Sequence, residues 1–135
     1  MKAVDPNQGE VALGMTSGAG IILIRDGKVL LLQGITGIWS FPKGHGEVKD
    51  PNPFVTAVRE TYEETGYMLG VDYEIIGDRM RLEKRIYWTA RPLRTLREPS
   101  LIAREHKGYK WVPVGDVNWL NINGGVKAWT RRTAA

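Results

Sequence analysis

The sequence contains no cysteine, which excludes disulfide bonds and thiolate zinc sites. It has no apolar run approaching the roughly 20 residues that cross a bilayer as a helix. Its first residues lack the basic-then-apolar pattern of a secretory signal. From these absences we expect a cytoplasmic protein without a membrane partner.

A strong excess of one charge sign is also missing. The formal net charge is +4, and the basic residues are scattered rather than clustered in a run. A basic nucleic-acid-binding module is therefore a rival interpretation without a recognition motif to support it. The surplus positive charge instead favours attraction of a polyanionic substrate. A length of 135 residues with 42% hydrophobic residues is ordinary for one globular domain.

The order of short apolar runs and turn signals predicts the organisation of the chain. Residues 1–15 show no sustained period and are predicted to be a poorly ordered extension or an edge strand at 10–13, ahead of a domain at 16–135. Asp26-Gly27 is a hairpin turn signal. A helical turn at 115–120 and a last helix capped by Asn123 follow the strands, which gives an α+β or α/β sandwich. Strands are expected at 18–24, 28–33, 38–41, 71–76, 79–91 and 109–114.

A helix between Asn52 and Gly66 is the centre of the sequence. Asn52 suits the N-cap, Pro53 the first helical position and Gly66 the C-cap. At about 100° per residue, the acids Glu60, Glu63 and Glu64 share one stripe of this helix. The opposite side collects an apolar face made of Phe54, Val55, Val58, Tyr62 and Thr65.

An acidic stripe costs stability unless something binds it. Like charges at i and i+4, as in Glu60 and Glu64, destabilise a helix by a few tenths of a kcal/mol. A divalent cation reverses the sign, and Mg²⁺ prefers carboxylate, water and phosphate oxygens. The alternative is a solvated acidic face. The loop Pro42-Lys43-Gly44-His45-Gly46, just before the helix, favours a ligand site because its glycines let the backbone approach a ligand closely.

These residues resemble the Nudix hydrolase family, whose box is written G-x5-E-x7-R-E-U-x-E-E-x-G-U, where U is aliphatic. The sequence has Gly44, Asp50 and then R-E-x-x-E-E-x-G from Arg59 to Gly66. Asp stands at the first acidic position, eight residues rather than seven separate it from Arg59, and Thr61 and Tyr67 replace aliphatic residues. The inserted residue leaves open whether Asp50 or Glu47 steadies Arg59.

Other segments resemble the asymmetrical diadenosine tetraphosphate hydrolase branch of that family. They are Leu30 to Gln33, Ile86-Tyr87-Trp88 and the E-H-x-x-Y-x-W string from Glu105 to Trp111. The resemblance implies an α/β/α sandwich with a mixed sheet between helices. It also implies cleavage of diadenosine tetraphosphate to ATP and AMP by a monomer or homodimer.

The resemblance also implies a role for each site residue. Mg²⁺, or Mn²⁺ in its place, is expected on Glu60, Glu63, Glu64 and the Gly44 carbonyl, with Arg59 orienting the acids. The general base is expected to be Glu63 or, by its place in the string, Glu105. Substrate contacts are expected from Lys43, His45, His106, Tyr87 and Tyr109.

Several alternatives remain open at this stage. Tyr87 and Tyr109 are expected either to stack on adenine or to lie in the core, where Trp39, Trp88 and Trp111 are placed. His106 can instead be purely structural. Rival substrates are an RNA 5′ end and a diphosphoinositol polyphosphate. A domain that binds nucleotides without catalysis is a further alternative, against which the intact acids argue.

Overall fold

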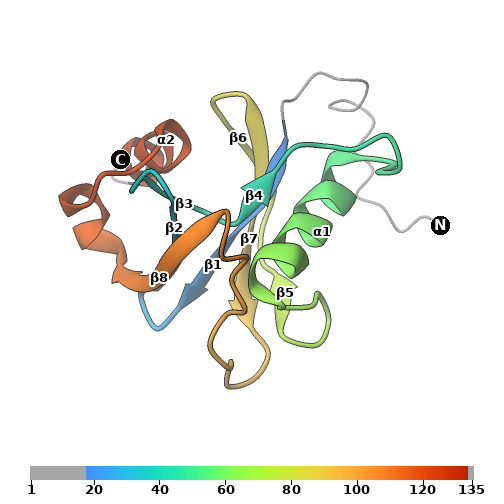
Figure 1. Cartoon of the computed structure of the whole chain (residues 1–135), viewed down its shortest axis with the longest axis horizontal. Coiled ribbons are helices and arrows are strands. Elements are labelled where there is room, and N and C mark those ends of the chain that lie inside the picture. Colours follow the sequence, from blue (N-terminus) through green and yellow to red (C-terminus); the bar gives the residue numbers. More distant parts are fainter. Residues whose placement is uncertain (1–17, 134–135) are drawn as a thin grey trace.

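A computed structural model describes residues 18–133, which form a mixed β-sheet between two helices (Figure 1). The predicted extension at 1–15 lies outside the described residues. The eight strands are β1 (Ala19–Arg25), β2 (Lys28–Gly34), β3 (Trp39–Ser40), β4 (Lys43–Gly44), β5 (Tyr73–Ile75), β6 (Met80–Leu82), β7 (Arg85–Pro92) and β8 (His106–Pro113).

The sheet is mixed because β1 runs parallel to β7, while the other pairs of strands are antiparallel. The main path is β3-β2-β1-β7-β5, with β4 on β1, β6 on β7 and β8 on β2. The first turn is the predicted hairpin, with φ of 52° at Asp26 and 75° at Gly27. Both values are positive, as a type I′ turn requires.

Alternating side chains of the central strands build two cores, one on each face of the sheet. Ile21 and Leu23 of β1 pack on the side of helix α1 (Pro53–Thr65), and Ile22 packs on the side of helix α2 (Gly124–Thr133). The period-2 alternation of a strand thus fills both faces, as expected for a sheet covered on each side. The predicted fold class is confirmed.

One predicted strand is two. Residues 79–91 form β6 and β7, joined by a tight turn at Glu83, where φ is 59°. The sequence at the turn, Glu83-Lys84, carries neither glycine nor proline, so no turn signal marked the break. Another difference is β4, which was expected to be loop. Its two residues pair with β1, with Gly44 opposite Ala19, and this pairing holds the loop against the sheet.

Helix α1 has the predicted caps. The Asn52 side-chain oxygen accepts a hydrogen bond from the Val55 N–H at 3.0 Å, and Gly66 ends the helix with φ of 82°. The predicted apolar face is right in part: Thr65 is buried and Phe54 packs against the core on this side, but Tyr62 is 54% exposed. The buried positions of the helix carry mostly small residues and one acid, namely Pro53, Thr56, Ala57, Thr61, Glu64 and Thr65. Small side chains let α1 approach the sheet closely. Close packing, rather than the hydrophobicity of individual residues, therefore decides which side of the helix is buried.

The C-terminal part follows the predicted order. Val114–Trp119 is a 3₁₀ helix, and the Asn123 side chain caps α2 by accepting from the Val126 N–H at 2.9 Å. Strand β8 begins at His106, three residues earlier than predicted. Among residues 18–133, no helix is long and apolar enough to cross a membrane.

Replacing the N-cap of α1 tests how strongly this cap fixes the helix. We expect Asn52→Ala to lower the free energy of unfolding by about 1 kcal/mol, because the Val55 N–H loses its partner. Urea unfolding followed by circular dichroism measures the change. Asn118→Ala, at an exposed position on the 3₁₀ helix, is the matched control and should leave stability unchanged. Equal effects of both changes would contradict the assigned cap.

Candidate active site

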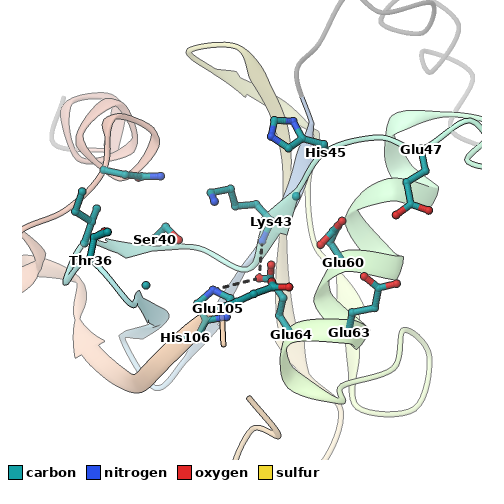
Figure 2. A pocket seen from close by; sticks show the side chains of 14 residues that line it. Thr36, Ser40, Lys43, His45, Glu47, Glu60, Glu63, Glu64, Glu105 and His106 are labelled. Carbon is teal, nitrogen blue, oxygen red and sulfur yellow. Dashed lines mark hydrogen bonds and ion pairs between the residues drawn. The ribbon is translucent and has the colours of Figure 1, made fainter. Parts of the chain in front are cut away.

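The acidic side of α1 faces a cleft of about 610 Å³. Figure 2 shows Glu60 and Glu63 on one side, Lys43 and His45 on the loop above, and Glu105 and His106 close to Glu64. The cleft is lined by Gly34, Thr36, Ile38, Ser40, Lys43, Gly44, His45, Glu47, Glu60, Glu63, Glu64, Glu105, His106 and Asn123.

Glu64 is the most deeply buried acid of the cleft, with 5% of its surface exposed. Its Oε1 accepts a hydrogen bond from the Lys43 backbone N–H at 3.1 Å. Burial raises the pKa of Glu64 to about 8, against the lowering effect of the Lys43 N–H and ammonium. Burial also raises the pKa of Glu60, although the neighbouring Arg59 opposes this. The cleft therefore holds two carboxyl groups that need an added positive charge to stay ionised together.

Arg59 connects the loop to the acids of the helix. Its Nε and Nη2 donate to the two carboxylate oxygens of Asp50 at 3.0 and 2.8 Å, whereas the Glu47 carboxylate lies 3.4 Å from Nη1. The hydrogen bond from Arg59 is the main reason why the pKa of Asp50 falls to about 2. Asp50 is thus the acid that steadies Arg59, and the alternative left open by the sequence is resolved in its favour.

The remaining donors of Arg59 reach the cleft. Nη1 donates to Glu60 Oε2 and Glu63 Oε1, both at 3.1 Å, and Nη2 donates to the His45 carbonyl oxygen at 3.1 Å. A guanidinium has a rigid fork of donors and keeps its charge, so it suits this bridging role. The geometry supports the orienting role predicted for Arg59.

Gly44 lies so close to Glu60 that a side chain at position 44 would have to displace the Glu60 carboxylate. A Cβ at Gly44 would lie 2.0 Å from Glu60 Cδ and 2.2 and 2.4 Å from the two carboxylate oxygens. The Gly44 carbonyl oxygen lies against Gly18, where a Cβ would meet it at 2.3 Å. Glycine at position 44 therefore leaves room for the Glu60 carboxylate in its observed place, while metal coordination through the Gly44 carbonyl stays a prediction.

Glu105 and His106 enter the cleft from the start of β8. With Glu64 they form a group whose potential ligand atoms all lie within 4.8 Å of one another, and His106 Nε2 is 4.0 Å from Glu64 Oε1. His106 Nδ1 is buried without a hydrogen-bond partner, and burial lowers the pKa of the ring. A neutral imidazole nitrogen beside carboxylates fits a divalent cation. From the sequence, Glu105 was expected to be a general base and His106 a substrate contact, and neither was grouped with Glu64.

Basic side chains line the other side of the acids. Lys43 is partly buried, and burial followed by the charge of Arg85 lowers its pKa. His45 is exposed at the same loop. Both residues line the cleft, as their predicted substrate contacts require.

The structure does not support the predicted stacking role of Tyr87. The ring has no exposed surface, lies in the core on the α2 side, and packs edge-on against Phe41 with centroids 5.4 Å apart. Strand alternation turns Tyr87 away from its neighbours Ile86 and Trp88, which fill the other core. Tyr109 is partly buried against the core on the α1 side, so its stacking role stays a prediction.

The far wall of the cleft was missed by sequence reasoning. It consists of uncharged residues from the end of β2, from β3 and from the connection between them, together with the residue that caps α2. Figure 2 labels Thr36 and Ser40 of this wall. The glycines at 34 and 37 marked a loop, but nothing in the sequence placed that loop opposite the acids. These wall residues are Gly34, Thr36, Ile38, Ser40 and Asn123.

The fold and the cleft define a class of domain in which a helix against a mixed sheet presents acids to a basic loop. The chain belongs to the NUDIX domain family, whose sequence profile matches residues 14–132. The predicted family membership is thereby confirmed.

The chain is also similar to individual members of the family. The asymmetrical bis(5'-nucleosyl)-tetraphosphatase of Mus musculus is 36% identical over 93 residues, and that of Rattus norvegicus is 34% identical over 93 residues. Each match covers 62% of this chain and 62% of the relative. A C. elegans Ap4A hydrolase complex superposes with a TM-score of 0.70 at 24% identity, covering 87% of this chain and 95% of that one.

The close approach at Gly44 gives a test of the acid cluster. We expect Gly44→Ala to displace the Glu60 carboxylate and to weaken Mn²⁺ binding by more than about tenfold, as measured by isothermal titration calorimetry. Gly115→Ala is the matched control, because a Cβ there meets nothing within 4 Å. Wild-type affinity in Gly44→Ala would show that Glu60 does not help to hold the cation.

The raised pKa of Glu64 makes stability depend on pH. An unfolded glutamate ionises near pH 4.5 and the folded one at about 8, so the folded state loses stability as the pH rises through this interval. Glu64→Gln cannot ionise and keeps an oxygen for the Lys43 N–H. In EDTA, we expect its unfolding free energy in urea to be near that of wild type at pH 5 and higher by up to about 5 kcal/mol at pH 9.

Glu63→Gln is the control for this pH series, since the Glu63 side chain lies on the same helix and is 42% exposed. We expect it to show no comparable widening between pH 5 and pH 9. A difference between Glu64→Gln and wild type that stays constant with pH would mean that Glu64 ionises normally in the folded protein.

Proposed function

We propose that this protein hydrolyses a phosphoanhydride bond in a dinucleoside polyphosphate with the help of Mg²⁺, and that it splits diadenosine tetraphosphate into ATP and AMP. The observation that carries the proposal is the convergence of Glu60, Glu63, Glu64 and Glu105 on one cleft beside Lys43. The mouse and rat relatives, which are named for tetraphosphate cleavage, support this substrate.

The acids of α1 have the chemistry to hold the cation. Glu60, Glu63 and Glu64 supply the oxygens, with Glu105 and His106 in reach of Glu64. When bound, Mg²⁺ neutralises phosphate charge and lowers the pKa of a water molecule. Arg59 keeps the helix acids in one orientation through its bonds to Glu60 and Glu63.

Glu105 is the better candidate for the general base. One oxygen of the Glu63 carboxylate is already occupied, because it accepts a hydrogen bond from Arg59 Nη1 at 3.1 Å. Glu105 is exposed, lines the cleft and lies near Glu64. In this mechanism Glu105 accepts the proton of the attacking water.

The polyphosphate would lie between the acids and the basic loop. Lys43 supplies a point charge at the cleft, while His45 and His106 supply ring nitrogens. Tyr109 remains the aromatic candidate for adenine, since Tyr87 is buried in the core. Stacking on a base contributes about 1–3 kcal/mol.

A substrate panel tests the proposal. The purified protein is incubated with Mg²⁺ and diadenosine tetraphosphate, triphosphorylated RNA, a diphosphoinositol phosphate or ADP-ribose, and the products are resolved by ion-exchange chromatography. We expect ATP and AMP in equal amounts, formed fastest from the dinucleotide. Pyrophosphate released preferentially from RNA would move the function to RNA 5′ ends, and no turnover would favour a binding domain.

Two variants tie any turnover to the cleft. We expect Glu64→Gln to remove Mg²⁺-dependent hydrolysis, because the most buried acid is lost, while cooperative unfolding is retained. Glu74→Gln, on strand β5, removes a solvent-exposed ion pair with Arg91 and should keep full activity. Full activity of Glu64→Gln would refute the metal assignment.

A further inference from the structure

The segment that carries Glu105 into the cleft is fastened to the end of α1. This return segment (residues 93–105) leaves β7 and leads back to β8 (Figure 1). The Ser100 N–H donates to the Thr65 carbonyl oxygen at 2.8 Å. The Arg97 guanidinium donates to the Gly66 carbonyl oxygen, and the Tyr67 hydroxyl donates to the Arg97 carbonyl oxygen. Consecutive residues at the end of α1, directly after Glu64, thus bind the return segment.

The buried carboxylate of Asp72 anchors the same segment. Asp72 is 1% exposed, and its Oδ1 accepts from Arg94 Nε and Nη2 at 3.0 and 2.8 Å and from Arg97 Nη1 at 3.1 Å. The Oδ2 atom of Asp72 accepts a hydrogen bond from the Met68 N–H at 2.8 Å. The backbone carbonyl oxygen of Asp72 accepts another from the Leu93 N–H at 2.9 Å. A buried ion is retained only where such partners compensate for its lost hydration. Asp72 is therefore a fixed point for the segment.

The fastening opposes a repulsion that acts whenever Glu64 and Glu105 are both ionised. Glu105 is exposed, yet one of its oxygens lies within 4.8 Å of the Glu64 carboxylate. The local support for this position is a turn in which the Glu105 and His106 N–H groups donate to the Ile102 carbonyl oxygen, both at 2.9 Å. An exposed carboxylate near another acid moves towards water unless its backbone is held. The backbone is held on one side by the pairing of His106 with Gly34 of β2 and on the other by the return segment.

We propose that Arg97 is a positioning residue that links Asp72 to the end of α1 and thereby sets the place of Glu105 and His106 beside Glu64. Its catalytic consequence rests on the proposed function, whereas its structural consequence does not. Arg97 touches neither the cleft nor any acid that lines it. It acts through the segment that it holds.

Arg94 provides the matched comparison. It binds the same oxygen of Asp72 and is about as exposed as Arg97, but no hydrogen bond joins it to α1. Removing either arginine weakens the ion pair with Asp72, and removing Arg97 also releases Gly66. A difference between Arg94→Gln and Arg97→Gln therefore isolates the link to the helix from the loss of a charge pair.

The first measurement is amide hydrogen exchange with Mn²⁺ titration, neither of which requires turnover. We expect Arg97→Gln to speed exchange at residues 100–106 and to weaken Mn²⁺ binding about tenfold, with Arg94→Gln close to wild type in both. Arg97→Lys serves if the glutamine variant does not fold. Its single ammonium cannot reproduce the two-sided fork, so exchange should rise here too. Unchanged exchange at 100–106 in the Arg97 variants would overturn the proposal.

The second measurement is a double-mutant cycle on hydrolysis of diadenosine tetraphosphate. If Arg97 acts through Glu105, Arg97→Gln lowers kcat by roughly tenfold to a hundredfold in the wild type and has little effect in Glu105→Gln. Independent, multiplicative losses would mean that Arg97 acts only on stability and would overturn the catalytic consequence. If the wild type cleaves no substrate of the panel, the proposed function fails, and exchange and Mn²⁺ binding decide the role of Arg97 alone.

Discussion

The burial of Glu64 and Glu60 against the sheet is the constraint on which the site depends. Carboxylates in such a place favour their neutral form, and the pKa of each is raised. The Arg59 guanidinium and the Lys43 N–H supply positive charge and hydrogen bonds to them, while Glu105 adds a further acid nearby. Strand β4 contributes to this support. Its pairing with β1 brings the Lys43 backbone and Gly44, which has no side chain, against α1.

Helix caps and turns could be predicted from the sequence, whereas the faces that helices and strands bury could not. The caps of α1 and α2 and the Asp26-Gly27 turn follow from single residues and their neighbours, and all are present. The buried face of α1 depends on how closely the helix approaches the sheet, which the hydrophobicity of its residues does not encode. Likewise, the string Ile86-Tyr87-Trp88 marks a strand without revealing which face each ring takes, so the sequence left Tyr87 open between stacking on adenine and the core.

The candidate site shows the same division. The three acids of α1 share a helix and could be grouped by periodicity, and the structure places all three at the cleft. Glu105 and His106 lie more than 40 residues further along the chain. Their approach to Glu64 is a tertiary contact, which depends on the path of the return segment. The choice between Asp50 and Glu47 also needed coordinates, because both lie in a loop whose path has one residue more than the family pattern.

The extra residue and the aspartate at position 50 leave the hold on Arg59 intact. Aspartate is one methylene shorter than the glutamate of the family pattern, yet both oxygens of Asp50 meet Arg59, at 3.0 and 2.8 Å. The same guanidinium reaches Glu60 and Glu63. A change in the length of the loop or of this side chain would therefore be felt at the acids of the helix, through the arginine that joins them.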